Sequence, residues 1–130
     1  MNITRNGIYY LKPSDIPKSL NSIVTHEVEI HIIDTFVKLH ISTSQDLFFE
    51  FARTFAFPEY FGFSLDALLD CLVELKGDHV VLLGIRPEIE GLFLPVLDML
   101  NRACIWHTFR KRRFTVLVTR FPVALSKARM

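Results

Sequence analysis

The stretch that decides the fold runs from Phe57 to Leu72 and reads FPEYFGFSLDALLDCL. Pro58 ends any helix that comes before it, because the residue preceding a proline is pushed out of the helical region. Ser64 is a good N-cap for a second helix. That helix places Asp66 and Asp70 four residues apart, and therefore on one face. Two like charges at this spacing cost roughly 0.2–0.5 kcal/mol, so the pair favours a surface that meets a cationic partner.

Two strands and a helix are predicted upstream of this stretch. Residues 28–32 alternate apolar and polar side chains, which indicates a strand with one buried face. Residues 36–41 have the pattern of a similar strand that continues or pairs with the first. Residues 42–44 offer N-caps for a helix. The apolar stripe of that helix consists of Leu47, Phe48, Phe51 and Phe55.

A strand, a helix and a last strand are predicted downstream. Residues 79–85 are a β-branched and leucine run, typical of a strand that is buried on both faces. Pro95 is well tolerated in the first turn of a helix, and the predicted helix extends from there through Trp106. Residues 114–119 form the last predicted strand. Because helices separate the strands, the order implies an α/β protein with a mostly parallel sheet.

The chain has 130 residues, which predicts a single domain. We divide it into an N-terminal extension over residues 1–33, a core over 34–119 and a C-terminal tail over 120–130. Within the extension, residues 8–11 favour a short strand and residues 18–24 one or two helical turns. Three roles stay open for the extension: it extends the sheet, covers an edge or widens an interface.

The run from Phe57 to Leu72 closely resembles the signature of the barstar family, which reads roughly P-E-Y-Y-G-x-N-L-D-A-L-W-D-C-L. Barstar is the intracellular protein inhibitor of the bacterial ribonuclease barnase. The resemblance implies a barstar-like α/β fold with about three core strands and about three helices. It also implies an immunity or antitoxin protein that occludes the active site of a cognate nuclease toxin, expected to be a ribonuclease, in a 1:1 complex of monomers.

The resemblance also implies a partner-binding site around the loop and the second helix. Asp66 and Asp70 would stand where substrate phosphates bind, because a ribonuclease holds phosphates with cationic side chains. Tyr60 and Gly62 would make the loop contacts. Their apolar neighbours Phe61, Phe63 and Leu69 would set the specificity for the partner. The predicted partner-binding residues are Tyr60, Phe61, Gly62, Phe63, Ser64, Asp66, Leu69 and Asp70.

Several positions depart from the family pattern and indicate a changed target. Leu69 replaces a tryptophan, Phe61 a second tyrosine, Phe63 an often polar residue and Ser64 an asparagine. Arg102 falls where barstar places an acidic contact residue, which makes it a possible additional interface residue. The sequence leaves open whether Leu69 and Arg102 retarget or abolish ribonuclease binding, and it does not identify the toxin or its chemistry.

Composition excludes several other classes of protein. The two cysteines are too few for a disulfide framework and are predicted to be free buried thiols. No histidine or cysteine spacing suits zinc, so neither a metal nor another cofactor is predicted. No segment approaches the roughly twenty apolar residues of a membrane helix, and no signal peptide is recognisable, so we expect a cytoplasmic protein.

An enzyme is not predicted either. None of the five histidines lies in a pattern with a nucleophile, and the chain has no glycine-rich phosphate loop. His26 and His31 flank the first alternating segment and are predicted to lie on the surface of the strand.

The alternative function is a nucleic-acid-binding module. Residues 110–113 read RKRR, with Trp106 and Phe109 nearby, and such a basic patch can contact phosphates. The formal net charge is only +1 and no stacking motif is present, so direct nucleic-acid binding is not expected. The run is instead typical of a helix C-terminus, where cations are favoured.

Overall fold

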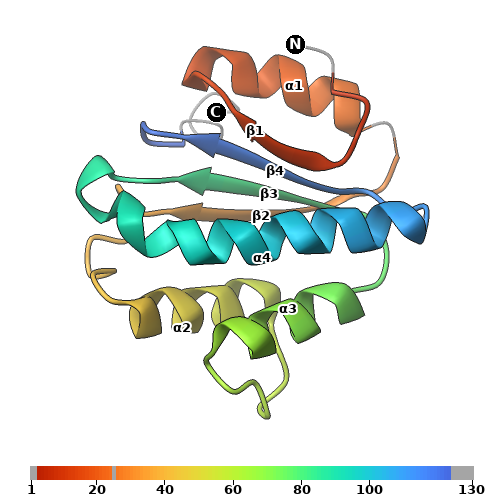
Figure 1. Cartoon of the computed structure of the whole chain (residues 1–130). Coiled ribbons are helices and arrows are strands. Elements are labelled where there is room, and N and C mark those ends of the chain that lie inside the picture. The colour runs from red at the N-terminus through yellow and green to blue at the C-terminus, as the bar shows by residue number, and fades with distance from the viewer. Residues whose placement is uncertain (1–2, 25, 124–130) are drawn as a thin grey trace.

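A four-stranded, fully parallel sheet forms the centre of the molecule in the computed structural model (Figure 1). The structure describes residues 3–24 and 26–123, so residues 124–130 of the predicted tail lie outside the described residues. The strands lie in the order β1-β4-β3-β2. Their bounds are Gly7–Tyr10 for β1, Glu29–Asp34 for β2, His79–Gly84 for β3 and Phe114–Thr119 for β4.

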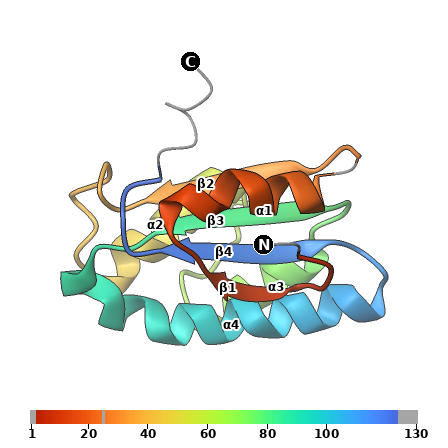
Figure 2. The same cartoon turned by 90° about the horizontal axis from the view of Figure 1, so that it is seen from above.

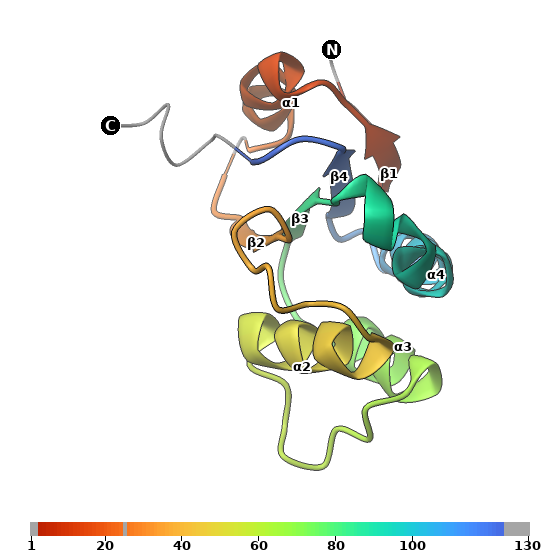
Figure 3. The same cartoon turned by 90° about the vertical axis from the view of Figure 1, so that its left-hand side faces the viewer.

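Helices cover both faces of this sheet (Figure 3). One face carries α1, and the other carries α2, α3 and α4. Two single turns of 3-10 helix, η1 and η2, precede α1 and α4. The bounds are Pro13–Asp15 for η1, Ile16–Ile23 for α1, Ser44–Phe55 for α2, Leu65–Glu74 for α3, Pro87–Ile89 for η2 and Glu90–Phe109 for α4. The predicted α/β class with a parallel sheet is therefore confirmed.

The two central strands are buried along their whole length. All six residues of β3 and all six of β4 are inaccessible to solvent or nearly so. In β3, Val81 and Leu83 belong to the core beneath α2, α3 and α4, whereas Val80 and Leu82 belong to a smaller core beneath α1. Because successive side chains of a strand point to opposite faces, such a strand requires a helical layer on each side.

The N-terminal extension builds β1 at one edge of the sheet, nearly all of β2 at the other edge, and one of the helical layers. β1 pairs with β4 in parallel, with Tyr10 opposite Val118 (Figure 2). Leu20 and Ile23 of α1 pack in the smaller core with Val80 and Leu82. The extension therefore extends the sheet and covers its second face. It supplies β1 and nearly all of β2, whereas the predicted core supplies β3 and β4, where about three strands were expected.

The prediction of a strand over residues 36–41 is wrong. The segment instead forms turns that lead from β2 to α2. One carboxylate oxygen of Asp34 accepts a hydrogen bond from the backbone N–H of Phe36 at 2.9 Å, and the backbone carbonyl of Asp34 accepts from Val37 and Lys38. An aspartate that bonds the backbone two residues ahead stabilises a turn. The alternating apolar residues Val37 and Leu39 are consequently exposed.

The expected position of Pro95 in a first helical turn is also corrected. α4 begins at Glu90, directly after η2, so Pro95 lies in its second turn. A proline there deprives the carbonyl four residues earlier of its hydrogen bond. That carbonyl belongs to Gly91, which is exposed, so solvent is available to satisfy it.

Both cysteines are free and buried, as predicted. Burial raises the pKa of Cys104 to about 12, so this thiol stays protonated at neutral pH. Among the described residues, no helix combines the length and apolar character needed to cross a membrane.

The end of β3 is held against the strand beside it and the segment after β4. A Cβ atom on Gly84 would lie 2.9 Å from the Oδ1 atom of Asp34 and 3.0 Å from a methyl carbon of Val123. The same Asp34 side chain accepts a hydrogen bond from the backbone N–H of Val123 at 2.9 Å through its other oxygen. Position 84 has room for a glycine only. The missing side chain allows β3, Asp34 of β2 and the segment after β4 to pack this closely.

Gly84→Ala is expected to lower the free energy of unfolding by about 1–3 kcal/mol, because the added methyl group displaces the buried Asp34 side chain. Gly91→Ala is the matched control. Its Cβ would meet nothing within 4 Å, so this helical substitution should leave stability unchanged or raise it by up to about 1 kcal/mol. Denaturant unfolding followed by circular dichroism measures both. Equal effects of the two substitutions would contradict the packing at Gly84.

Candidate protein-binding site

The loop between α2 and α3 projects from the helical layer, away from the sheet (Figure 1). α2 ends at Phe55 and is followed by Ala56 in the left-handed region, with φ of 53°. The backbone N–H of Phe61 donates to the carbonyl of Pro58 at 3.0 Å, which closes the turn at the tip. The resulting loop, residues 57–64, is the segment whose sequence carries the predicted site.

Aromatic rings fill the inside of this loop. The ring centroids of Phe57 and Phe61 lie 5.1 Å apart, and those of Phe61 and Phe63 lie 4.9 Å apart. Phe61 is buried, and it therefore supports the loop from inside. Tyr60 next to it is 74% exposed, and Phe63 is 37% exposed. The structure thus divides the predicted aromatic set into an inner support and outer side chains.

Gly62 is exposed at the tip of the loop, and folding does not demand a glycine there. Its φ lies outside the left-handed region. A Cβ atom at this position would meet only the Cβ of Ala67, at an ordinary contact distance of 3.6 Å. A glycine that the fold itself does not require is suited to close approach by another molecule.

Ser64 starts α3 and sets the direction of its acidic face. The Ser64 hydroxyl accepts a hydrogen bond from the backbone N–H of Ala67 at 3.1 Å, which makes it the N-cap. Leu68 and Leu72 then turn inward and are fully buried. Asp66 and Asp70 point to solvent, and neither carboxylate has a hydrogen bond or ion pair with any residue that the structure describes.

A third carboxylate extends this acidic face. Glu74 follows Asp70 by one helical turn and is exposed. Its charge is the main cause that raises the pKa of Tyr60. The same charge, after burial, helps raise the pKa of Cys71. The spacing i, i+4, i+8 was visible in the sequence, but our prediction stopped at Asp70. We call Asp66, Asp70 and Glu74 the acidic edge of α3.

The remaining predicted residues lie beside this edge or on the next helix. Leu69 is half-buried against the core, next to the acidic edge. Arg102 is exposed on α4, and its guanidinium lies 3.3 Å from a carboxylate oxygen of Asp98 one turn earlier. Exposed ion pairs of this kind are weak, so Arg102 remains available to a partner at little cost.

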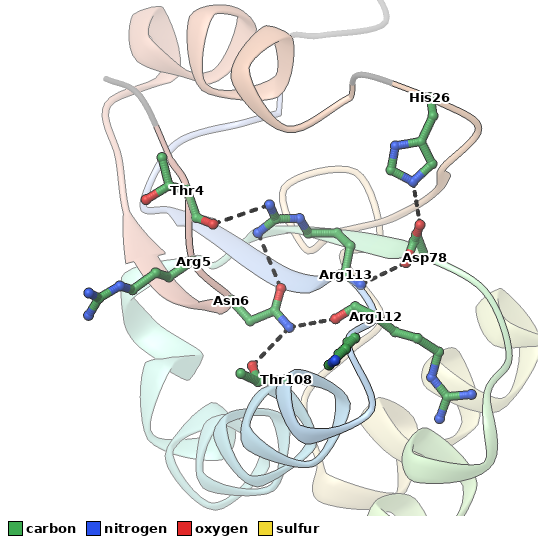
Figure 4. A pocket seen from close by; sticks show the side chains of 9 residues that line it. Thr4, Arg5, Asn6, His26, Asp78, Thr108, Arg112 and Arg113 are labelled. Carbon is green, nitrogen blue, oxygen red and sulfur yellow. Dashed lines mark hydrogen bonds and ion pairs between the residues drawn. The ribbon is translucent and has the colours of Figure 1, made fainter.

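The basic run over residues 110–113 does not form one continuous patch. Arg110 stacks over the ring of Trp106, 4.5 Å from its centroid. Arg113 turns inward and donates to the Asn6 side chain at 3.2 Å and to the Thr115 hydroxyl at 3.0 Å (Figure 4). Lys111 and Arg112 line an open pocket of about 640 Å³ together with Thr4, Arg5, Asn6, His26, Asp78, Thr108 and Arg113. The Asp78 carboxylate accepts from His26 and from the backbone of Arg113, which reduces the positive charge of this pocket.

A parallel α/β domain with a projecting loop and an exposed acidic helix edge defines a candidate protein-binding protein. A family model described as Barstar (barnase inhibitor) matches residues 35–119, which is well over half of the chain. The chain therefore belongs to the barstar family, and the resemblance seen in the sequence is confirmed. The match runs from the turn after β2 to the end of β4, so β1, α1 and β2 lie outside it. A search of curated proteins finds no match.

Ser64→Ala is expected to lower the free energy of unfolding by about 1 kcal/mol, because the first turn of α3 loses its cap. The loss should be accompanied by faster amide hydrogen exchange over residues 64–67. Ser64→Asn is the control, since asparagine caps a helix as well as serine does. It should change the free energy of unfolding by no more than a few tenths of a kcal/mol. An Asn variant as unstable as the Ala variant would contradict the capping role.

Proposed function

We propose that this protein inhibits a bacterial nuclease toxin, a ribonuclease by family analogy, by laying residues 57–64 and the acidic edge of α3 over the active site. The observation that carries the proposal is the acidic edge itself. Asp66, Asp70 and Glu74 carry three negative charges within α3, which has no cationic residue. The family match covers all three positions.

The proposed mechanism is mimicry of the substrate backbone. A ribonuclease binds phosphates through arginine, lysine and histidine, and carboxylates make charge-assisted hydrogen bonds with the same groups. A helix holds its carboxylates at fixed spacing, so little conformational freedom is lost when the surfaces meet. The net charge of the whole chain is +1, which means that attraction of a basic partner depends on the local charge of this edge.

The aromatic loop supplies the apolar part of the proposed interface. Tyr60 presents an exposed ring and a hydroxyl, and the exposed Phe63 lies beside it in the loop. Aromatic residues of this kind anchor protein interfaces because they bury a large area with few rotatable bonds. Leu69, where the family pattern has tryptophan, offers a smaller side chain, so the partner is expected to differ from barnase in shape at this point. The inhibitor would act as a monomer in the cytoplasm, where a ribonuclease meets RNA.

Asp66→Ala/Asp70→Ala is expected to abolish capture of the toxin while changing the melting temperature little, because neither carboxylate has a described partner inside the protein. Gly62→Ala should weaken capture at least tenfold through steric exclusion, which corresponds to about 1.4 kcal/mol. Immobilised protein is exposed to a native lysate, and the eluate is assayed for ribonuclease activity that added wild-type protein suppresses.

Asp15→Ala is the matched control for charge, because Asp15 lies before α1 on the opposite side of the sheet. It should capture the same ribonuclease activity as the wild type. Equal capture by the wild type and the double variant would place the interface elsewhere. Absence of any retained nuclease activity from a lysate that contains the toxin would refute the proposed function.

The nucleic-acid alternative rests on the pocket that contains Arg5, Lys111 and Arg112. Direct RNA binding would weaken steeply with salt, because phosphate contacts release condensed counterions. We expect no RNA binding by the isolated protein in fluorescence anisotropy, since Arg110 and Arg113 are engaged within the protein and Asp78 lies in the pocket. Salt-dependent binding that Lys111→Ala/Arg112→Ala removes would instead favour the alternative.

A further inference from the structure

Two buried histidines and one carboxylate meet at the start of β2 and β3. Glu29 lies opposite His79 in the parallel register of these strands, and His31 lies two residues further along β2 on the same face. The Nε2 atom of His31 is 3.0 Å from the Nδ1 atom of His79. One carboxylate oxygen of Glu29 is 3.6 Å from the first nitrogen and 3.7 Å from the second. The prediction that His31 lies on the strand surface is therefore wrong.

The second nitrogen of the His79 ring is directed at a backbone carbonyl. The Nε2 atom of His79 lies 2.7 Å from the carbonyl oxygen of Lys76, a distance at which it donates its proton. In a neutral imidazole this leaves the Nδ1 atom of His79, which faces His31, with a lone pair. The Nε2 atom of His31 faces that lone pair at 3.0 Å, a distance that one proton or a bridging cation can span.

The His79 lone pair, the Nε2 atom of His31 and the Glu29 carboxylate converge, and either a proton on the His31 nitrogen or a cation can lie between them. Histidines that bind metals commonly donate their other N–H to a carbonyl or carboxylate, which fixes the tautomer and the ring orientation. His79 has that support from the carbonyl of Lys76. The arrangement is thus that of a ligand set in which one histidine already has its outer hydrogen bond.

The size of the site fits a zinc-like ion. The three ligand atoms form a triangle with sides of 3.0, 3.6 and 3.7 Å, whose circumscribed radius is about 2.0 Å. Bonds from zinc to histidine nitrogen and to carboxylate oxygen are about 2.0–2.2 Å. Calcium requires about 2.3–2.6 Å and several oxygen ligands, so it fits poorly.

The surroundings hold the rings in place and leave an open side. Phe55 of α2 stacks on His31 with ring centroids 4.0 Å apart, and Phe114 of β4 lies beside His79. His31 and His79 are 8% and 3% exposed, whereas the Glu29 side chain is 72% exposed. An ion can therefore enter from the side of Glu29, where water is available as a fourth ligand.

We propose that Glu29, His31 and His79 form a binding site for a divalent transition-metal ion of the zinc class. The ion would join β2, the exposed edge strand, to β3, next to Phe55 of α2, which stacks on His31. This site is separate from the acidic edge of α3, and its test does not depend on the toxin.

The test is isothermal titration of chelator-treated protein with Zn²⁺, together with visible spectroscopy after addition of Co²⁺. The wild type is expected to bind one ion per chain, to gain the visible bands of four-coordinate Co²⁺ and to melt at a higher temperature with Zn²⁺. Glu29→Gln removes an exposed ligand with little risk to folding and should weaken binding at least tenfold.

His31→Gln/His79→Gln should abolish binding, once circular dichroism has shown that this double variant is folded. His40→Gln is the matched control, because His40 is exposed in the turn before α2 and should bind metal like the wild type. Absence of binding by the wild type at micromolar Zn²⁺ would overturn the proposal and leave the two rings sharing a proton. Equal binding by the wild type and Glu29→Gln would overturn it as well.

Discussion

The structure depends on the requirement that a parallel sheet be covered on both faces. Every residue of β3 is buried, and its alternate side chains enter two different cores. Within residues 3–24 and 26–123, α2, α3 and α4 cover one face and α1 covers the other. Because α1, like β1 and β2, lies outside the family match, the N-terminal extension supplies the cover of the second face. Without it, Val80, Leu82 and Leu117 would lie on an open face of the sheet.

The same layering frees one side of α3 for binding. α3 packs mainly on α4 and not on a strand, so its outer side faces solvent (Figure 3). The helix macrodipole favours Asp66 in the first turn but disfavours Glu74 in the last turn. Repulsion between neighbouring carboxylates adds a further small cost. Stability of the isolated protein therefore does not explain the acidic edge, which is why the proposed function assigns this edge to a cationic partner.

Stacked rings connect the histidine pair with the projecting loop. His31 stacks on Phe55, which in turn stacks on Phe57 with centroids 5.5 Å apart. Phe57, Phe61 and Phe63 continue the series into the loop. This series gives the phenylalanine-rich composition a structural role. The rings pack against one another in sequence from the edge strand β2 to the base of the candidate interface. These ring contacts add to the hydrogen bond from Phe61 to the Pro58 carbonyl in supporting the turn that carries Tyr60.

The sequence by itself determined those features whose causes are local. Hydrophobic runs predict β3 and β4, and the Ser64 cap predicts the start of α3. The spacing of Asp66 and Asp70 predicts that both carboxylates lie on one face of that helix. These follow from periodicity and capping, which act over a few residues. The family signature depends on the same short stretch.

Only the tertiary structure decided which distant groups meet. Residues 36–41 alternate like a strand, yet the Asp34 side chain turns the backbone there. The sequence places Phe61 among the predicted partner-binding residues, and only the fold shows that its ring lies inside the loop. His31 and His79 are far apart in sequence and gave no metal pattern, because pairing of β2 with β3 alone brings their rings together. Local patterns fix the elements, whereas contacts between elements depend on packing that no short window of sequence contains.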